Sequence, residues 1–294
     1  MLVRAPSCGI AIAAIALLAC RSGDGSRRAA ADSAAPAAKA QLAYSAAAPN
    51  VVTITAKDYA FDAPAEIPAG PTTFRLENRG PSLHHMQLIR LEQGKTAADF
   101  IAALKAGGPP PRWATMVGGP NPREVGTEAN ATLDLAPGNY VVVCFIPDSA
   151  GVPHVMHGMV RPLTVTGTMP ASVAEPTADV NMALVDYGFE LSKPITAGRH
   201  TIRVDDKGQQ PHEVVVIRLK PGKTPEDFAA WAEHPRGPSP ATLEGGVSGI
   251  MPGTHAYFTT DFEPGEYALI CFIPDMKDGK PHIAHGMVKR FTVS

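Results

Sequence analysis

Each half of this chain ends in a loop that carries a cysteine, a histidine and a methionine. In both loops an apolar run of β-forming residues delivers the cysteine, a turn-rich segment follows, and the histidine and methionine come in the pattern His-x4-Met. The residues are Cys144, His154 and Met159 in the first loop, and Cys271, His282 and Met287 in the second. Thiolate, imidazole and thioether groups are soft or borderline metal ligands, so the two loops predict two metal sites.

One further histidine stands in register in each half. His84 and His212 are 128 residues apart, which is also the separation of His154 and His282. Two histidines and a cysteine with a weak axial methionine form the blue-copper arrangement, so the predicted ligands suit copper. We therefore predict two copper ions, with the ligand sets His84, Cys144, His154, Met159 and His212, Cys271, His282, Met287.

Alternatives to these ligands remain open. His157 and His285 also repeat, in His-x2-His-Gly-Met, and either could replace the earlier histidine of its pair. We favour the earlier one because its longer spacing to the methionine leaves room for both side chains to face one ion. Structural zinc would explain the cysteines and histidines but not the methionines. A disulfide between Cys144 and Cys271 would require the two cores to touch, so separate metal thiolates fit better.

The repeat also defines the predicted domains. Two copies of about this length are typical of two domains, placed at 51–167 and 178–294 with a Pro- and Ala-containing linker at 168–177. In the first copy, β-forming runs bounded by Gly, Pro and Asn fall at 51–56, 72–77, 84–91, 131–135, 140–146 and 160–165. Thr96 and Thr224 are candidate N-caps of one short helix per copy. The expected fold is all-β, with two tandem β-sandwiches and one inserted helix in each.

Composition and the N-terminus indicate where the protein acts. A net charge of −2 without a dense basic cluster gives no electrostatic case for nucleic acid. Residues 1–20 resemble an export signal that ends in the bacterial lipobox pattern Leu-x-Ala-Cys, which predicts a lipid on Cys20. Residues 21–50 are predicted to be a flexible tether. We expect a periplasmic or cell-surface lipoprotein that is held to the membrane by its N-terminal lipid.

At the ligand loops the chain resembles the cupredoxins, the family of plastocyanin and azurin. The shared features are Pro-Gly-x-Tyr before the cysteine, His-x4-Met with glycine before the methionine, and Pro211-His212-Glu-Val around a first histidine. The resemblance covers roughly residues 51–294 and implies a Greek-key sandwich with copper at one end. Nine residues separate Cys144 from His154, and ten separate Cys271 from His282. This long loop is similar to that of copper nitrite reductases.

The resemblance implies single-electron transfer with a redox protein partner. We expect no oxidase or reductase activity, because no histidine stands beside Cys144 or Cys271 and no His-x-His occurs to build a second copper centre. An alternative function is copper binding and delivery to an acceptor in copper homeostasis. A third, in which both halves are interaction domains without metal, does not explain why each keeps all four ligand types.

Overall fold

The computed structural model describes residues 48–107, 110–170 and 174–294. These residues belong to one compact unit that spans Ser45–Ser294. The predicted export signal, the lipidation site Cys20 and almost all of the predicted tether lie outside the described residues, as do three positions of the predicted linker. Within the described residues, no helix is long and apolar enough to cross a membrane.

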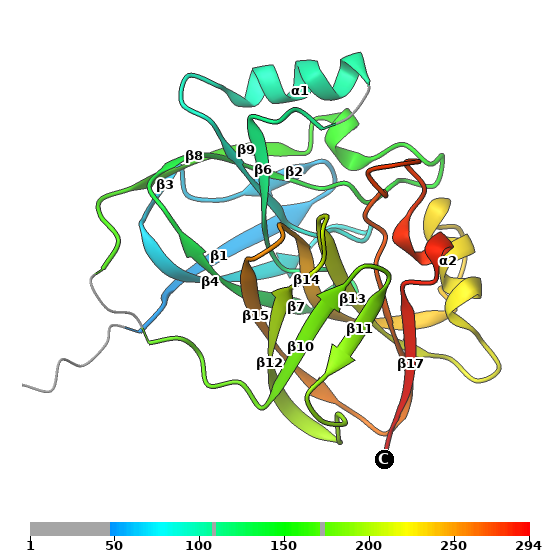
Figure 1. The fold of residues 1–294 in the computed structure, drawn as a ribbon. Helices are drawn as coiled ribbons and strands as arrows, with labels where there is room; N and C mark the ends of the chain where they lie inside the picture. Colours follow the sequence, from blue (N-terminus) through cyan, green and yellow to red (C-terminus); the bar gives the residue numbers. More distant parts are fainter. Residues whose placement is uncertain (1–47, 108–109, 171–173) are drawn as a thin grey trace, which may run out of the picture. The chain divides into compact units, whose positions relative to one another are not determined.

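The two sequence repeats fold into matching successions of elements, except that the first has one additional short strand, β3 at Glu66–Pro68 (Figure 1). The first contains β1 (Asn50–Lys57), β2 (Ala60–Asp62), β3 (Glu66–Pro68), β4 (Gly70–Asn78), β5 (Gln87–Leu91), α1 (Ala97–Ala106), β6 (Ala114–Gly118), β7 (Glu128–Leu135), β8 (Gly138–Val143), the 3-10 helix η1 (His154–His157) and β9 (Val160–Thr166). The second contains β10 (Val180–Val185), β11 (Gly188–Leu191), β12 (Gly198–Asp206), β13 (His212–Leu219), α2 (Pro225–Glu233), β14 (Ala241–Ile250), β15 (His255–Phe262), β16 (Gly265–Ile270), η2 (His282–His285) and β17 (Val288–Val293). The predicted mostly-β fold with one α-helix per repeat is confirmed.

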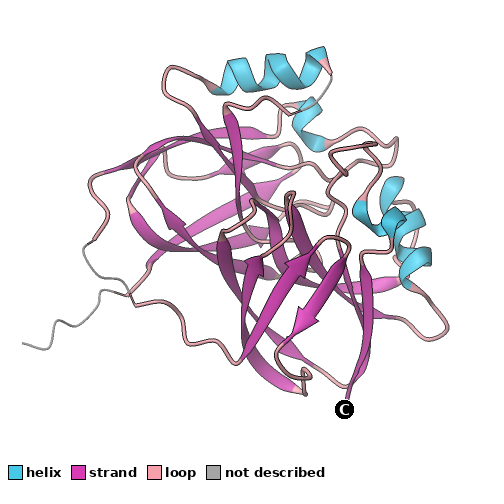
Figure 2. Ribbon diagram, in the orientation of Figure 1, coloured by secondary structure: helices cyan, strands magenta, loops and turns pink. Residues whose placement is uncertain are grey.

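Both sheets run through both repeats (Figure 2). One has the strand order β11-β10-β12-β15-β7-β4-β1-β2, and the other has the order β17-β16-β13-β14-β6-β5-β8-β9-β3. The repeats meet where β15 pairs with β7, through Tyr257 and Thr132, and where β14 pairs with β6, through Ile250 and Val117. Sequence analysis did not predict this continuity. The division into two domains, with a linker at 168–177, therefore remains a prediction.

The strands that lead to the cysteines, β8 and β16, both belong to the nine-stranded sheet and are largely buried. In β8 and in β16 the last four residues are buried, and the cysteine follows directly with no exposed surface. Their Val, Leu and Ile side chains suit a strand that is covered on both faces. Each cysteine thiol is thus delivered into the apolar core shared by the two sheets.

The predicted helix starts are confirmed. Thr96 and Thr224 each accept a hydrogen bond from the backbone of the third helical residue, Asp99 or Asp227, whose carboxylate bonds back to the cap. The prediction for 84–91 differs from the structure, because β5 begins only at Gln87. The backbone N–H of Met86 donates instead to the carbonyl of Pro120, in a loop, and this leaves His84 outside the ladder.

Candidate metal centre

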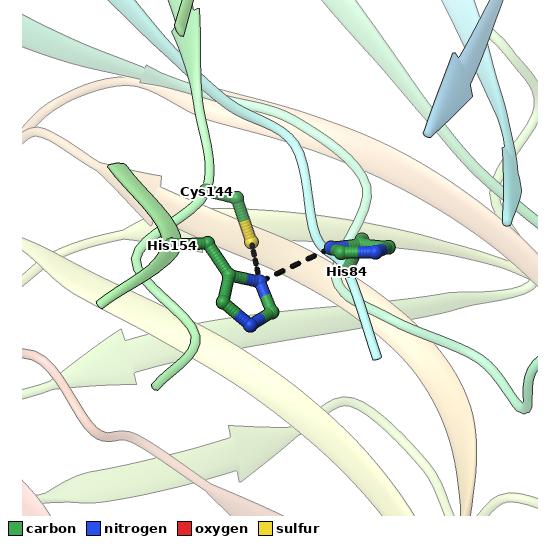
Figure 3. A group of neighbouring side chains, drawn as sticks. All are labelled: His84, Cys144 and His154. Atoms are coloured by element: carbon green, nitrogen blue, oxygen red, sulfur yellow. Dashed lines mark hydrogen bonds between the residues drawn. The ribbon is translucent and has the colours of Figure 1, made fainter. Parts of the chain in front are cut away.

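Three predicted ligands of the first repeat converge on one point. The Nδ1 atoms of His84 and His154 are 3.1 Å apart, and Sγ of Cys144 is 3.6 Å from Nδ1 of His154 (Figure 3). All three side chains are buried, and the predicted axial ligand Met159 is buried in the same core. No other buried group of three His, Cys, Asp or Glu side chains this close together occurs in the described residues.

Local backbone bonds fix the ligand loop. The N–H of His154 donates to the carbonyl of Ile146, and the N–H of Val155 donates to the carbonyl of Cys144, which clamps η1 beside the end of β8. Gly158 then takes a left-handed conformation with φ of 94°, which glycine tolerates at no steric cost. This turn lets the N–H of Met159 bond back to the carbonyl of His154. The glycine before the methionine is therefore needed for the geometry of the loop.

The separations fit one shared ion. Two nitrogens bound at about 2.0 Å to a tetrahedral ion lie about 3.3 Å apart, and a nitrogen and a sulfur at about 2.3 Å lie about 3.5 Å apart. The observed distances are 3.1 Å between the two nitrogens and 3.6 Å between nitrogen and sulfur. Nδ1 of His84, Nδ1 of His154 and Sγ of Cys144 can therefore hold a metal with little rearrangement.

A carboxylate orients the first histidine. Oδ1 of Asp58 is 2.8 Å from Nε2 of His84, so Nε2–H donates to the carboxylate and the Nδ1 lone pair faces the cluster. Sequence analysis missed Asp58, although Asp186 repeats it at the same 128-residue spacing as the histidines. Recurrence of a carboxylate in step with the ligands is the signal that could have found it.

Burial sets the protonation of the ligands. Loss of hydration lowers the pKa of His154 to about 4, with a further contribution from the nearby His84, whose own pKa is also lowered by burial. Burial raises the pKa of Cys144 to about 12. At neutral pH the imidazoles are thus already in the neutral form that binds metal, whereas the thiol must lose its proton when a metal arrives.

The second repeat brings together its cysteine and loop histidine in the same way. Sγ of Cys271 is 3.4 Å from Nδ1 of His282, and Met287 is buried in the same core. The ring centroids of His212 and His282 are 4.8 Å apart. Nδ1 of His212, however, bonds to Asp206 at 3.0 Å instead of facing His282.

One substitution between the repeats explains this difference. Asp206 stands where the first repeat has Asn78, whose amide donates to the carbonyl of Ser82 and makes no bond to His84. A buried carboxylate attracts an imidazole N–H more strongly than an amide does, because the bond is charge-assisted. Turning the His212 ring by half a revolution about its Cβ–Cγ bond would exchange Nδ1 with a ring carbon and reproduce the first site.

The alternate histidines point to other partners. Nε2 of His157 is 2.9 Å from Asp148, and Nε2 of His285 is 3.1 Å from Asp278. Both imidazoles are exposed, so the structure brings His154 and His282, and not these two, to the cysteines.

A tyrosine in an unusual conformation covers each site. Tyr59 has φ of 60° and Tyr187 has φ of 65°, the only non-glycine residues with positive φ in the described chain. Tyr59 packs edge-on against His154 at 5.2 Å, and Tyr187 packs in the same way against His282 at 5.5 Å. Side chains rarely hold this backbone conformation unless the surroundings require it, so the recurrence marks both as parts of the sites. Sequence analysis did not identify these tyrosines as part of the sites.

The chain matches no protein-family model and no curated protein. It is similar to solved copper proteins. Auracyanin from Roseiflexus castenholzii is 25% identical over 41% of this chain and 100% of that protein, with a TM-score of 0.30. A blue copper oxidase from Nitrosomonas europaea is 13% identical over 84% of this chain and 86% of that protein, with a TM-score of 0.25. The copper nitrite reductase of the same organism is 14% identical, over 84% and 94%, with a TM-score of 0.24.

The fold is cupredoxin-like. The sandwich of two sheets, the cysteine at the end of a buried strand and the histidine of the following loop are arranged as the sequence resemblance implied. One expectation is corrected. We excluded oxidases and reductases from the absence of certain histidine patterns, but the similar two-domain structures include an oxidase and a reductase.

Proposed function

We propose that this chain binds two copper ions in type 1-like sites and passes single electrons between redox partners. The observation that carries the proposal is the buried cluster of His84, Cys144 and His154, whose ligand atoms already stand at metal-sharing distances. Cys271 and His282 repeat two of its three members in the second copy. Bound copper would supply one-electron chemistry, cycling between Cu(II) and Cu(I).

The protein's own residues would keep the two oxidation states similar in structure. Cys144 and its loop are clamped by backbone bonds, and Asp58 holds the imidazole of His84 from the far side. Rigid, buried ligands that need little movement favour electron exchange, since each structural rearrangement adds to the barrier. Tyr59, which is partly exposed, lies between His154 and solvent-exposed His157, so this end of the site is its nearest approach to a partner.

The first experiment loads residues 45–294 with Cu(II) and records the visible spectrum together with the copper content per chain. We expect two coppers and an intense thiolate-to-copper band. Cys144→Ser should remove one chromophore and leave the other, and Cys271→Ser should do the reverse. Loss of both chromophores in either variant, or of neither, would contradict independent sites.

A second pair of variants separates the candidate ligands in each loop. His154→Gly should abolish the band of the first site, whereas His157→Gly should leave it, because His157 bonds to Asp148 and not to the cysteine cluster. The opposite pattern would assign the ligand role to the later histidine.

We further propose export and anchoring through a lipid on Cys20, which would place the copper sites outside the cytoplasm. This rests on the lipobox pattern alone. The test is metabolic labelling with a radioactive fatty acid. The label should enter the wild-type chain and be lost in Cys20→Ser, and labelling of that variant would contradict the proposal.

A second candidate function is copper delivery, which the second site favours. There the Nδ1 of His212 is held by Asp206, so the full ligand set is not preassembled. A site that must rearrange to bind its ion also releases it more readily. Transfer of Cu(I) to a chelating acceptor should then empty the second site first, and retention of both ions would favour the electron carrier.

A further inference from the structure

Two residues beside the ligand histidines face each other across the junction of the repeats. His85 follows His84, and Glu213 follows His212. Their side chains are 8% and 5% exposed, and Asn121, which is 1% exposed, lies between them. Nδ1 of His85 is 3.3 Å from Oδ1 of Asn121, and Nδ2 of Asn121 is 3.3 Å from Oε2 of Glu213. The three side chains form a continuous hydrogen-bonded chain from one repeat to the other.

Each end of this hydrogen-bonded series contacts the residue that follows one of the cysteines. The backbone N–H of Phe145, the residue after Cys144, donates to Nε2 of His85 at 2.8 Å. The backbone N–H of Phe272, the residue after Cys271, donates to Oε1 of Glu213 at 3.1 Å. Glu213 also donates its own N–H to Sγ of Cys271, at 3.4 Å.

These contacts leave one consistent assignment of hydrogens. Because Nε2 of His85 accepts from Phe145, its Nδ1 carries the hydrogen and donates to Oδ1 of Asn121. The amide of Asn121 then donates towards Glu213 and also to the carbonyls of Val214 and Val247, at 2.9 and 3.0 Å. The direction of donation is therefore the same along the whole path from His85 to Glu213, and hydrogen bonds in such a series polarise one another.

The path lies along a largely apolar cavity. His85, Asn121 and Glu213 lie along a cavity of about 500 Å³ whose other walls are mostly apolar, including Phe145 and Phe272. Other side chains near this path also bond across the junction to a backbone carbonyl of the other repeat, among them Gln87 to Gly249 and Ser248 to Met86, both at 2.9 Å. The Ser248 hydroxyl bonds to Met86, whereas the backbone N–H groups of Phe145 and Phe272 bond to His85 and Glu213, so Ser248 provides a matched control.

We propose that His85, Asn121 and Glu213 form a bridge through which the two copper sites exchange an electron within one chain. The inference rests on the proposed function, because it requires copper at both sites. One electron leaves Cu(I) at one site and reduces Cu(II) at the other, and no proton or further reactant is consumed. Electronic coupling between two centres is stronger through hydrogen-bonded atoms than across an equal distance of empty space. Asn121 is the middle member of the series, so the path is broken without it.

The test uses the full chain loaded with copper at both sites. Met159→Gln is introduced as a common background, because a changed axial ligand shifts the potential and spectrum of the first site relative to the second. A substoichiometric pulse of a one-electron reductant is then added. The redistribution of the electron between the two sites is recorded from their two absorption bands. Asn121→Ser gives position 121 the same side chain as the control residue Ser248. This variant should slow the redistribution of the electron several-fold with both coppers still bound. Ser248→Ala should leave it unchanged.

A second readout needs no metal. In the metal-free chain, Asn121→Ser should speed hydrogen exchange of the Phe145 and Phe272 amides together, because it frees both of their acceptors, and Ser248→Ala should not. An unchanged transfer rate in Asn121→Ser, with two coppers bound, overturns the bridge and leaves the proposed function intact. Binding of fewer than two coppers overturns the proposed function and the bridge with it.

Discussion

Protonation of the buried His85 should account for a measurable part of the acid sensitivity of the metal-free protein. Burial lowers the pKa of His85 to about 4, because the charged imidazolium would lose its hydration; the nearby imidazoles of His154 and His84 lower it further, and the hydrogen bond to Asn121 opposes the shift. In the unfolded chain the same imidazole takes up a proton near pH 6.5. Below that pH the unfolded state binds more protons than the folded state, so stability falls as pH falls towards 4.

The size of the effect follows from the two pKa values. A separation of this kind corresponds to about 3 kcal/mol between pH 7 and pH 4, since each pKa unit is about 1.4 kcal/mol. His85→Gln isolates it, because a glutamine can accept from Phe145 through its oxygen and donate to Asn121 through its nitrogen without titrating. The variant should lose that part of the pH dependence whatever its stability at pH 7.

The assay is chemical denaturation of the metal-free protein, with a chelator present, at pH 7, 5.5 and 4. The wild-type free energy of unfolding should drop more steeply than that of His85→Gln, by about 3 kcal/mol over the range. His234→Gln, at an exposed histidine, should follow the wild type. Parallel curves for wild type and His85→Gln would refute the reasoning, since they would mean that the buried imidazole accepts a proton without opposing the fold.

Two further predictions concern the metal sites. In the metal-free protein, Asp206→Asn should turn the imidazole of His212 to the orientation that His84 has in the first repeat, and Asn78→Asp should turn His84 the opposite way. The nitrogen chemical shifts of the rings report their orientation. Unchanged shifts would contradict a role for the carboxylate. Copper uptake at pH 7 should release about one proton per site, because burial holds the thiol pKa at about 12 in Cys144 and raises it in Cys271. A pH-stat titration that finds no released proton would rule out thiolate ligation.

Much of the fold was accessible from the sequence because its signals are local. The β-forming runs, the Thr96 and Thr224 caps and the Gly before each methionine act within a few residues of themselves. The sharing of both sheets between the repeats was not accessible. It depends on single contacts such as Tyr257 with Thr132, which join residues 125 positions apart and leave no periodic trace.

The candidate site divides in the same way. The type and register of the candidate ligands were predicted from the sequence, because Cys, His and Met suit copper and the repeat supplies each of them twice. The order of the two histidines in each loop was predicted from spacing, and the structure shows the physical basis: an exposed imidazole is held by Asp148, and a buried one faces Cys144.

By itself, then, the sequence determined the chemistry available to this protein: two loops, two first histidines and a mostly-β scaffold to hold them. Only the tertiary structure decided how the two sets differ and how they are connected. A side chain's orientation depends on which buried partner offers the better hydrogen bond, as Asp206 does for His212. A bridge such as His85, Asn121 and Glu213 exists only once the fold has brought distant residues together and buried their side chains against one another.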